Sequence, residues 1–266
     1  MYKIGFLGGG TMAEAILNGI MSHNVIMSGP SSIMVAEISA SRRDSLRSSY
    51  PTVAVTESVE DMLKICEMII LAVKPYQLPQ IIHETASYWE GKAVVSILAG
   101  WNYTKLANLL PKSRLLRVMP NTAAKVSAAM SALASEYTLT SEEYSLAKQI
   151  FESCGEVVEL SETQFDAVTA ISGSGPAYVY MFIDAMTQGG VLHGLPKAVA
   201  RKMAVQTVLG AAEMVRVTDK SPNDLKDDVC TPGGTTIEAV YALENNRFSA
   251  TVIDAVTACF EKSRRM

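Results

Sequence analysis

The stretch Lys3-Ile4-Gly5-Phe6-Leu7-Gly8-Gly9-Gly10-Thr11-Met12-Ala13 places a run of glycines directly after a short apolar segment. The apolar segment predicts a buried strand, and Met12 to Met21 predicts a helix because its apolar side chains recur at helical spacing. Gly8, Gly10 and Ala13 match the G-x-G-x-x-G/A spacing. In that pattern the first glycine permits a tight turn, the second lets a pyrophosphate approach the backbone, and the small third residue lets the helix pack on the strand. The unit therefore predicts a dinucleotide-binding domain.

A second predicted strand, Ile33 to Ala36, ends at Glu37. An acid at this position usually binds the adenosine ribose hydroxyls and favours NADH. Its distance from Gly10 exceeds the usual ~20 residues, and the polar loop Gly29-Pro30-Ser31-Ser32 can absorb the excess. A solvated strand end is the plain alternative. The opposite preference, for the 2′-phosphate of NADPH, could come from Ser39, Ser41, Arg42 and Arg43. The choice between NADPH and NADH stays open.

Further predicted strands alternate with helices through the first half, as in a doubly wound sheet. They are Val53–Val55, Met68–Val73, Ala93–Leu98 and Leu115–Met119, with a helix at Val59–Ile65. Their apolar runs are typical of buried parallel strands, whose carboxyl ends meet at one ligand-binding edge. Lys74-Pro75, Ala99-Gly100 and Pro120-Asn121-Thr122 follow three of these strands. Lys74 could meet the nicotinamide ribose or a substrate carboxylate, or simply cap a strand at the surface. Residues 1–160 are thus a predicted α/β Rossmann domain with a mostly parallel sheet.

After Glu156–Leu160 the strand signals stop, and residues 161–266 are predicted to form an all-α domain. Helices are expected at Gln164–Ile171, Ala177–His193, Pro196–Val215 and about Ser249–Glu261, with a break at Ser172-Gly173-Ser174-Gly175-Pro176. Gly189-Gly190 would loosen the second of these or permit a close helix contact. Apolar residues cover more than one stripe of these helices, which a small helical domain cannot bury by itself. A second copy of the chain is the expected cover, so a homodimer is predicted.

The segment Cys230-Thr231-Pro232-Gly233-Gly234-Thr235-Thr236 leads into a predicted helix from Ile237 to Glu244. Threonine hydroxyls at a helix start lie beside unpaired backbone N–H groups and the positive end of the helix dipole. Such an arrangement is suited to a small carboxylate. An ordinary helix cap after a Pro-Gly turn is the alternative interpretation.

The composition narrows the class of protein. The 266 residues include 48% apolar and 19% charged residues with a net charge of −4, which argues against a nucleic-acid binder. No apolar stretch approaches a membrane span, and no signal peptide precedes the first strand, so a cytoplasmic enzyme is expected. The scattered Cys66, Cys154, Cys230 and Cys259 and the isolated His23, His83 and His193 predict no metal site and no His-based triad.

Several blocks occur together in a fixed order along the chain. They are Gly8-Gly9-Gly10-Thr11-Met12-Ala13-Glu14-Ala15-Ile16, Ala72-Val73-Lys74-Pro75, Met119-Pro120-Asn121-Thr122, Ser172-Gly173-Ser174-Gly175-Pro176-Ala177-Tyr178 and Pro232-Gly233-Gly234-Thr235-Thr236-Ile237. With them the chain closely resembles the pyrroline-5-carboxylate reductase family from end to end. The resemblance implies a Rossmann domain and a helical dimerisation domain, with dimers that commonly assemble to decamers. It also implies reduction of 1-pyrroline-5-carboxylate to L-proline by NADPH or NADH, the last step of proline biosynthesis.

The resemblance carries functional roles onto matching positions. By the resemblance, substrate binding is expected at Glu162, Asp219, Thr235 and Thr236. The chemistry of the residues themselves adds Gly233 and Gly234 as binders of the carboxylate and Thr236 and Lys74 as catalytic residues. Cofactor binding is expected at Gly8, Gly9, Gly10, Thr11, Met12, Ala13, Ala72, Val73, Lys74, Pro75, Ile97, Leu98 and Ala99. Glu37 is added from its place at the end of the second strand, not from the resemblance. The chain departs from the family pattern at Ala123 and Ala129. It departs again at Glu37-Ile38, which puts a preference for NADPH in doubt.

The expected reaction needs little acid–base machinery, because a protonated cyclic imine readily accepts hydride and the protein's task is orientation. The Thr236 hydroxyl is predicted to bond the ring nitrogen. Two alternatives remain. One is a related Rossmann oxidoreductase acting on another imine or a beta-hydroxyacid, for which Lys197 and Lys202 are the candidate lysines. The other is a scaffold that senses the dinucleotide without turnover.

Overall fold

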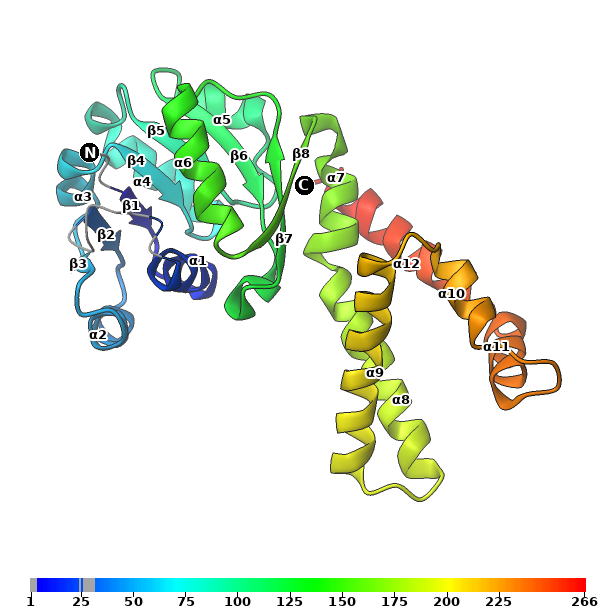
Figure 1. Ribbon diagram of the computed structural model, residues 1–266. Helices are drawn as coiled ribbons and strands as arrows, with labels where there is room; N and C mark the ends of the chain where they lie inside the picture. Colours follow the sequence, from blue (N-terminus) through cyan, green and yellow to red (C-terminus); the bar gives the residue numbers. More distant parts are fainter. Residues whose placement is uncertain (1–3, 24, 26–31) are drawn as a thin grey trace. The chain divides into compact units, whose positions relative to one another are not determined.

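The computed structural model describes residues 4–23, 25 and 32–266 of the chain (Figure 1). The expected loop at residues 29–32 therefore lies outside the described residues except for Ser32. The chain divides into two compact units, Met1–Gly173 with Phe260–Met266, and Ser174–Cys259. The division into a cofactor-binding domain, residues 1–160, and a substrate-binding domain, residues 161–266, stays a prediction. The compact first unit continues to Gly173.

The first unit is built on an eight-stranded sheet in the order β3-β2-β1-β4-β5-β6-β7-β8. Neighbouring strands from β3 to β6 pair in parallel, β7 is antiparallel to β6, and β8 is parallel to β7. The expected mostly parallel sheet is confirmed, with its reversal of strand order at β1, between β2 and β4. The strands are β1 Ile4–Leu7, β2 Ile33–Ala36, β3 Ala54–Thr56, β4 Met68–Leu71, β5 Ala93–Ser96, β6 Arg114–Met119, β7 Ala129–Ala134 and β8 Gly155–Leu160.

Helices cover both faces of this sheet (Figure 1). Alternate strand residues point to opposite faces, so Phe6 packs in the core with α1 and α6, whereas Leu7 packs in the core with α3, α4 and α5. The helices of this unit are α1 Thr11–Ser22, α2 Ala40–Ser49, α3 Val59–Ile65, α4 Leu78–Glu84, α5 Tyr103–Leu109, α6 Ser141–Glu152 and α7 Phe165–Val168. Short 3-10 turns lie at Pro75–Gln77, Ala86–Tyr88, Thr122–Val126 and Glu162–Gln164, and a π-helical turn at Thr169–Gly173 follows α7.

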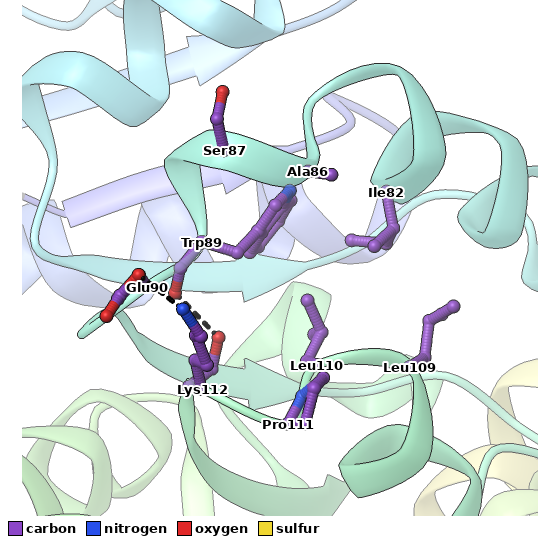
Figure 2. A pocket seen from close by; sticks show the side chains of 10 residues that line it. Ile82, Ala86, Ser87, Trp89, Glu90, Leu109, Leu110, Pro111 and Lys112 are labelled. Atoms are coloured by element: carbon purple, nitrogen blue, oxygen red, sulfur yellow. Dashed lines mark hydrogen bonds and ion pairs between the residues drawn. The ribbon is translucent and has the colours of Figure 1, made fainter.

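A hollow of about 410 Å³ in the first unit lies beside Trp89, between α4 and the segment that precedes β6 (Figure 2). Glu90 and Lys112 form an ion pair of 2.9 Å at this hollow. Its lining residues precede β5 and β6, so it lies at the amino ends of the parallel strands. Ligands of such sheets bind at the carboxyl ends, and the site must be sought at the opposite edge.

The second unit consists of helices: α8 Gly175–Leu192, α9 Lys197–Val217, α10 Pro222–Asp228, α11 Thr235–Asn245 and α12 Phe248–Ser263, of which residues 260–263 belong to the first unit. In Figure 1, α8 and α9 run side by side as a hairpin. A Cβ at Gly190 would lie 2.9 Å from the Ala200 Cβ, so this glycine permits the close helix contact that the sequence suggests. Gly194, at φ 92°, makes the turn between the two helices.

This unit has almost no core of its own. Of its residues, Ser174–Cys259, all described, only Thr187, Ala200 and Ala204 are buried. Large apolar side chains stay exposed on every long helix, including Met181, Leu192, Leu209, Tyr241 and Ile253. Among the described residues, no helix is both long and apolar enough to span a membrane.

Candidate active site

The turn after β1 requires glycine at its first position. Gly8 has a φ of 97°, and its N–H donates a hydrogen bond of 2.8 Å to the Ala36 carbonyl. A Cβ here would lie 2.8 Å from the Ala72 carbonyl oxygen, in the neighbouring strand end. Both the left-handed backbone and the close approach exclude a side chain. This turn lies where β2, β1 and β4 end, at the reversal point of the sheet.

The next two glycines differ in what surrounds them. Gly9 is buried, and a Cβ there would lie 2.5 Å from the Leu46 side chain on α2. Gly10 is exposed, and no atom lies within 4 Å of the position its Cβ would take. Open space beside the backbone is what the approach of a pyrophosphate needs. The turn therefore fits a dinucleotide.

The helix that follows leaves its first amides open. Gly10 is the N-cap of α1, and no side chain caps the helix. By contrast, Ser39, Ser58, Asn102 and Thr140 cap α2, α3, α5 and α6 with side-chain oxygens. Ala13 is fully buried against the sheet, so the helix start lies close to the turn. Unpaired N–H groups and the helix dipole make this start of α1 suitable for phosphate.

The ends of β4 and β5 supply the remaining predicted cofactor residues. Ala72 N–H donates to the Leu7 carbonyl at 2.8 Å, and the exposed Lys74 donates its backbone N–H to Gln77 at 3.1 Å. Pro75 and Ala99 both line a hollow of about 430 Å³. Leu98 is different, because its side chain is buried in the core and only its backbone can face a ligand.

Glu162, a predicted substrate residue, lies in the first unit and is held by other protein groups. It forms an ion pair with Arg117, which is nearly buried on β6, and accepts the Tyr103 N–H at 3.1 Å. The Arg117 guanidinium also lies 4.6 Å from the centre of the Phe165 ring. These contacts fix the start of the segment that leads to α7. A direct contact with substrate stays a prediction.

Two of the sequence blocks meet in the first unit. The Asn121 side-chain amide, after β6, donates 3.0 Å to the Ser172 carbonyl in the π-helical turn. The Asn121 side-chain oxygen Oδ1 accepts the Ala123 N–H at 3.2 Å. Asn121 therefore joins the end of a central strand to the turn that immediately precedes α8.

The Pro-Gly-Gly-Thr-Thr segment of the second unit has the same construction as the nucleotide turn. Gly233 has a φ of 68°, and Gly234 is the N-cap of α11 without a capping side chain. A Cβ at Gly234 would lie 2.3 Å from the Thr231 hydroxyl oxygen and 3.1 Å from its carbonyl oxygen, so a side chain there would require Thr231 to shift. Thr235 is exposed and Thr236 half-buried at the first turn. This helix start also presents open amides to an anion.

The neighbouring α10 is closed by comparison. Ser221 and Asp224 form a reciprocal capping box at its start, which uses the amides that a ligand would need. Asp219, the other predicted substrate acid, lies exposed between α9 and α10. Its role stays a prediction. Lys197 and Lys202, the lysines of the alternative reaction, lie exposed on α9.

Comparisons with known proteins address the family directly. Residues 162–266 match the family model described as pyrroline-5-carboxylate reductase dimerisation, and residues 3–100 match a coenzyme F420-dependent NADP oxidoreductase model. The chain is 41% identical to pyrroline-5-carboxylate reductase of Synechocystis sp. over 264 residues, covering 99% of this chain and 98% of that one. It is also 41% identical to the enzyme of Escherichia coli over 266 residues, with coverage of 99% and 98%. The chain belongs to the pyrroline-5-carboxylate reductase family.

Solved structures of this family have the same fold over the whole chain. Pyrroline carboxylate reductase of Plasmodium falciparum, crystallised with NADP bound, has a TM-score of 0.89 at 34% identity, with coverage of 99% of this chain and 97% of that one. The enzyme of Coxiella burnetii has a TM-score of 0.90 at 31% identity, with coverage of 99% and 98%. The predicted two-part fold, a Rossmann domain and a helical dimerisation domain, is therefore confirmed.

The structure adds residues that the sequence did not single out for this pyrroline-5-carboxylate reductase family site. Glu14 pairs with Arg42 at 2.6 Å beside the nucleotide turn, and Arg117 pairs with Glu162. One signal was available for Arg117, because it is a charged residue inside an otherwise apolar strand. Glu14 lies on a helix face and carries no such signal, since its partner comes from α2.

Proposed function

We propose that this protein reduces 1-pyrroline-5-carboxylate to L-proline with a reduced nicotinamide dinucleotide. The observation that carries the proposal is the pair of glycine-capped helices. The start of α1 is open for a pyrophosphate, and the start of α11 is open for a small carboxylate. Membership of the pyrroline-5-carboxylate reductase family supports a dinucleotide and a pyrroline carboxylate as the ligands proposed for these two sites.

The dinucleotide supplies the hydride, and this chain's residues bind and orient. The backbone at Gly8–Ala13 and the start of α1 bind the phosphates, with Glu37 at the adenosine ribose. Ala72–Pro75 and Ile97–Ala99 border the nicotinamide half, where Lys74 meets its ribose or the substrate carboxylate. In the case of Leu98 the backbone alone takes part.

The second unit binds the substrate. The amides of Gly233 and Gly234 and of the first turn of α11 bind the carboxylate together with the Thr235 hydroxyl. Thr236 Oγ1 accepts a hydrogen bond from the protonated ring nitrogen and so holds the imine in its reactive, cationic form. Asp219 and Glu162 are proposed to border this substrate, with Glu162 held in its ion pair with Arg117. The cofactor residues and most of the substrate residues lie in different units, so neither unit alone is expected to be active.

The protein is a homo-oligomer by family, since residues 162–266 match a dimerisation model. We propose a homodimer in which a second copy covers the exposed apolar residues of α8, α9, α11 and α12, and assembly of dimers into a decamer. The proposed compartment is the cytoplasm. Neither a nucleic acid nor a membrane is a proposed partner.

Initial rates test the function. The purified protein is given 1-pyrroline-5-carboxylate with NADH or NADPH, and loss of absorbance at the reduced-nicotinamide band is followed. Turnover to proline with at least one cofactor is expected. A panel of other cyclic imines and beta-hydroxyacids separates the alternative oxidoreductase. Dinucleotide binding without turnover of any of these compounds would instead support the sensing scaffold and contradict the proposal.

A further inference from the structure

The carboxylate of Glu37 is fixed at the end of β2 by two backbone amides. Gly9 N–H donates to Oε2 at 2.8 Å, and Ser39 N–H donates to Oε1 at 2.8 Å. Gly9 belongs to the nucleotide turn, so the position of the carboxylate is tied to that of the turn. Each carboxylate oxygen has a second acceptor site. Glu37 can therefore still accept hydrogen bonds from hydroxyl groups.

The two arginines that could receive a phosphate here are held by the protein. Arg42 donates to the Gly9 carbonyl and to Glu14, both at 2.6 Å. Arg43 donates to the carbonyls of Glu37 and Ile38 at 3.0 Å and 2.7 Å. Its other terminal nitrogen lies 2.8 Å from a carboxylate oxygen of Glu57.

The charges of this cluster add up to an excess of negative charge. Three carboxylates, Glu14, Glu37 and Glu57, face two guanidinium groups. The guanidinium of Arg42 pairs with Glu14 and that of Arg43 with Glu57, so the third carboxylate, that of Glu37, is matched by backbone amides alone in these contacts. A 2′-phosphate carries between one and two negative charges at neutral pH and would meet a like charge. A ribose with free hydroxyls would donate to it.

We infer that Glu37 makes this chain select the dinucleotide without a 2′-phosphate, NADH over NADPH. The inference rests on the proposed function only in taking the turn after β1 as the dinucleotide site. It sets this chain apart from the NADP-bound relative of Plasmodium falciparum. The expected preference is at least about tenfold in affinity, which corresponds to ~1.4 kcal/mol.

Binding of the oxidised cofactors tests this without any catalysis. Isothermal titration calorimetry with NAD⁺ and with NADP⁺ is expected to give at least tenfold tighter binding of NAD⁺ to the wild type. Glu37→Gln removes the charge and one of the two oxygens that accept backbone amides. A loss of affinity common to both cofactors cancels in the ratio, so the ratio should fall at least fivefold through the loss of charge. Glu90→Gln, in the exposed pair with Lys112 at the opposite edge of the sheet, makes the same change of net charge and should leave the ratio within about twofold.

Three results would overturn the inference. They are equal or tighter binding of NADP⁺ by the wild type, an unchanged ratio in Glu37→Gln, and an equal change in both variants, which would reduce the effect to net charge. The wild-type ratio decides even if a variant fails to fold. No pyrroline carboxylate is present, so failure of the substrate assignment would leave the binding result standing. Conversely, equal or tighter binding of NADP⁺ together with turnover of 1-pyrroline-5-carboxylate would overturn the inference and leave the proposed reaction intact.

Discussion

Gly8 and Gly10 are both glycines of one turn, yet different forces keep them small. Gly8 has a left-handed backbone and abuts the Ala72 carbonyl, so its constraint belongs to folding. Gly10 has an ordinary φ of −71° and open space at its Cβ position. Its constraint is the ligand that would occupy that space.

Alanine variants of the two glycines separate these constraints. Gly8→Ala is expected to lower the free energy of unfolding by roughly 1–3 kcal/mol and to weaken cofactor binding, because the turn must move. Gly10→Ala should leave the Tm within a few degrees and still weaken cofactor binding at least tenfold. Thermal unfolding and calorimetry with NAD⁺ measure both quantities. A Gly10→Ala protein with wild-type affinity would contradict the placement of the pyrophosphate.

Thr236 is the residue on which substrate activation depends in the proposed reaction. Thr236→Ala removes the hydroxyl that bonds the protonated ring nitrogen, and we expect kcat/KM to fall roughly 10- to 1000-fold. Thr236→Ser retains the hydroxyl and should restore most of that loss. Cofactor affinity, measured separately, should stay unchanged in both variants. Wild-type kinetics in Thr236→Ala would remove this residue from the mechanism.

Among the elements, α6 is joined to the sheet by a partly buried ion pair. Glu143, at the start of α6, pairs with Arg114 on β6 and also accepts the Thr140 N–H at 2.9 Å. The Arg114 hydrogen bond, helped by the Thr140 amide, lowers the pKa of Glu143 despite the opposing effect of burial. A lowered pKa stabilises the fold above the ordinary glutamate value of ~4.3. This contribution is lost as the pH falls through the lower folded value.

Removing this carboxylate gives a prediction for stability and its pH dependence. Glu143→Gln should lower the free energy of unfolding by about 2 kcal/mol at neutral pH. This loss is smaller than that expected for breaking a fully buried ion pair, because Arg114 is partly exposed. Below about pH 4 the wild type loses stability as Glu143 takes up a proton, and the stability of the variant should fall less over the same pH range. Glu90→Gln, in the exposed pair with Lys112, should change stability by less than ~0.5 kcal/mol. Equal effects in denaturant titrations would contradict the role of Glu143.

The elements also mark how far the sequence leads. The strand β1, its glycine turn and α1 are predictable because strand, turn and helix signals adjoin, and α11 is predictable from its Pro-Gly-Gly-Thr-Thr start. The strand β7 is not predicted, because Ala129–Ala134 is mostly alanine and serine, which lack a strand preference and form a strand here through burial. The ion pair of Arg117 with Glu162 joins segments that are distant in the sequence. A single sequence does not show which acid pairs with a given arginine, so this contact could not be predicted.

For the whole molecule, the exposed apolar helices of the second unit should decide the assembly. Met181 on α8 is 74% exposed in the single chain. If a second copy covers it, Met181→Lys buries an unpaired charge in the interface and should weaken the dimer roughly 100-fold or more. Light scattering at micromolar concentration is expected to show a smaller mass for the variant.

A surface change in the first unit serves as the control for assembly. Ile65 at the end of α3 is 43% exposed, and Ile65→Lys should leave the mass unchanged. A wild-type protein that is a stable monomer at micromolar concentration would contradict the proposed homodimer, whatever the variants show.

Few residues of Ser174–Cys259 are buried in the single chain, so the stability of this unit should depend on the proposed second copy. If these helices bury their apolar residues only against a second copy of the chain, they do not fold stably in a monomer. By mass action, the folded fraction then rises with the concentration of the chain. A variant chain that still dimerises would then also reduce the activity of the wild-type chain with which it pairs. In a cell that expresses a wild-type and a variant allele, the loss of activity would then extend to wild-type chains in mixed dimers.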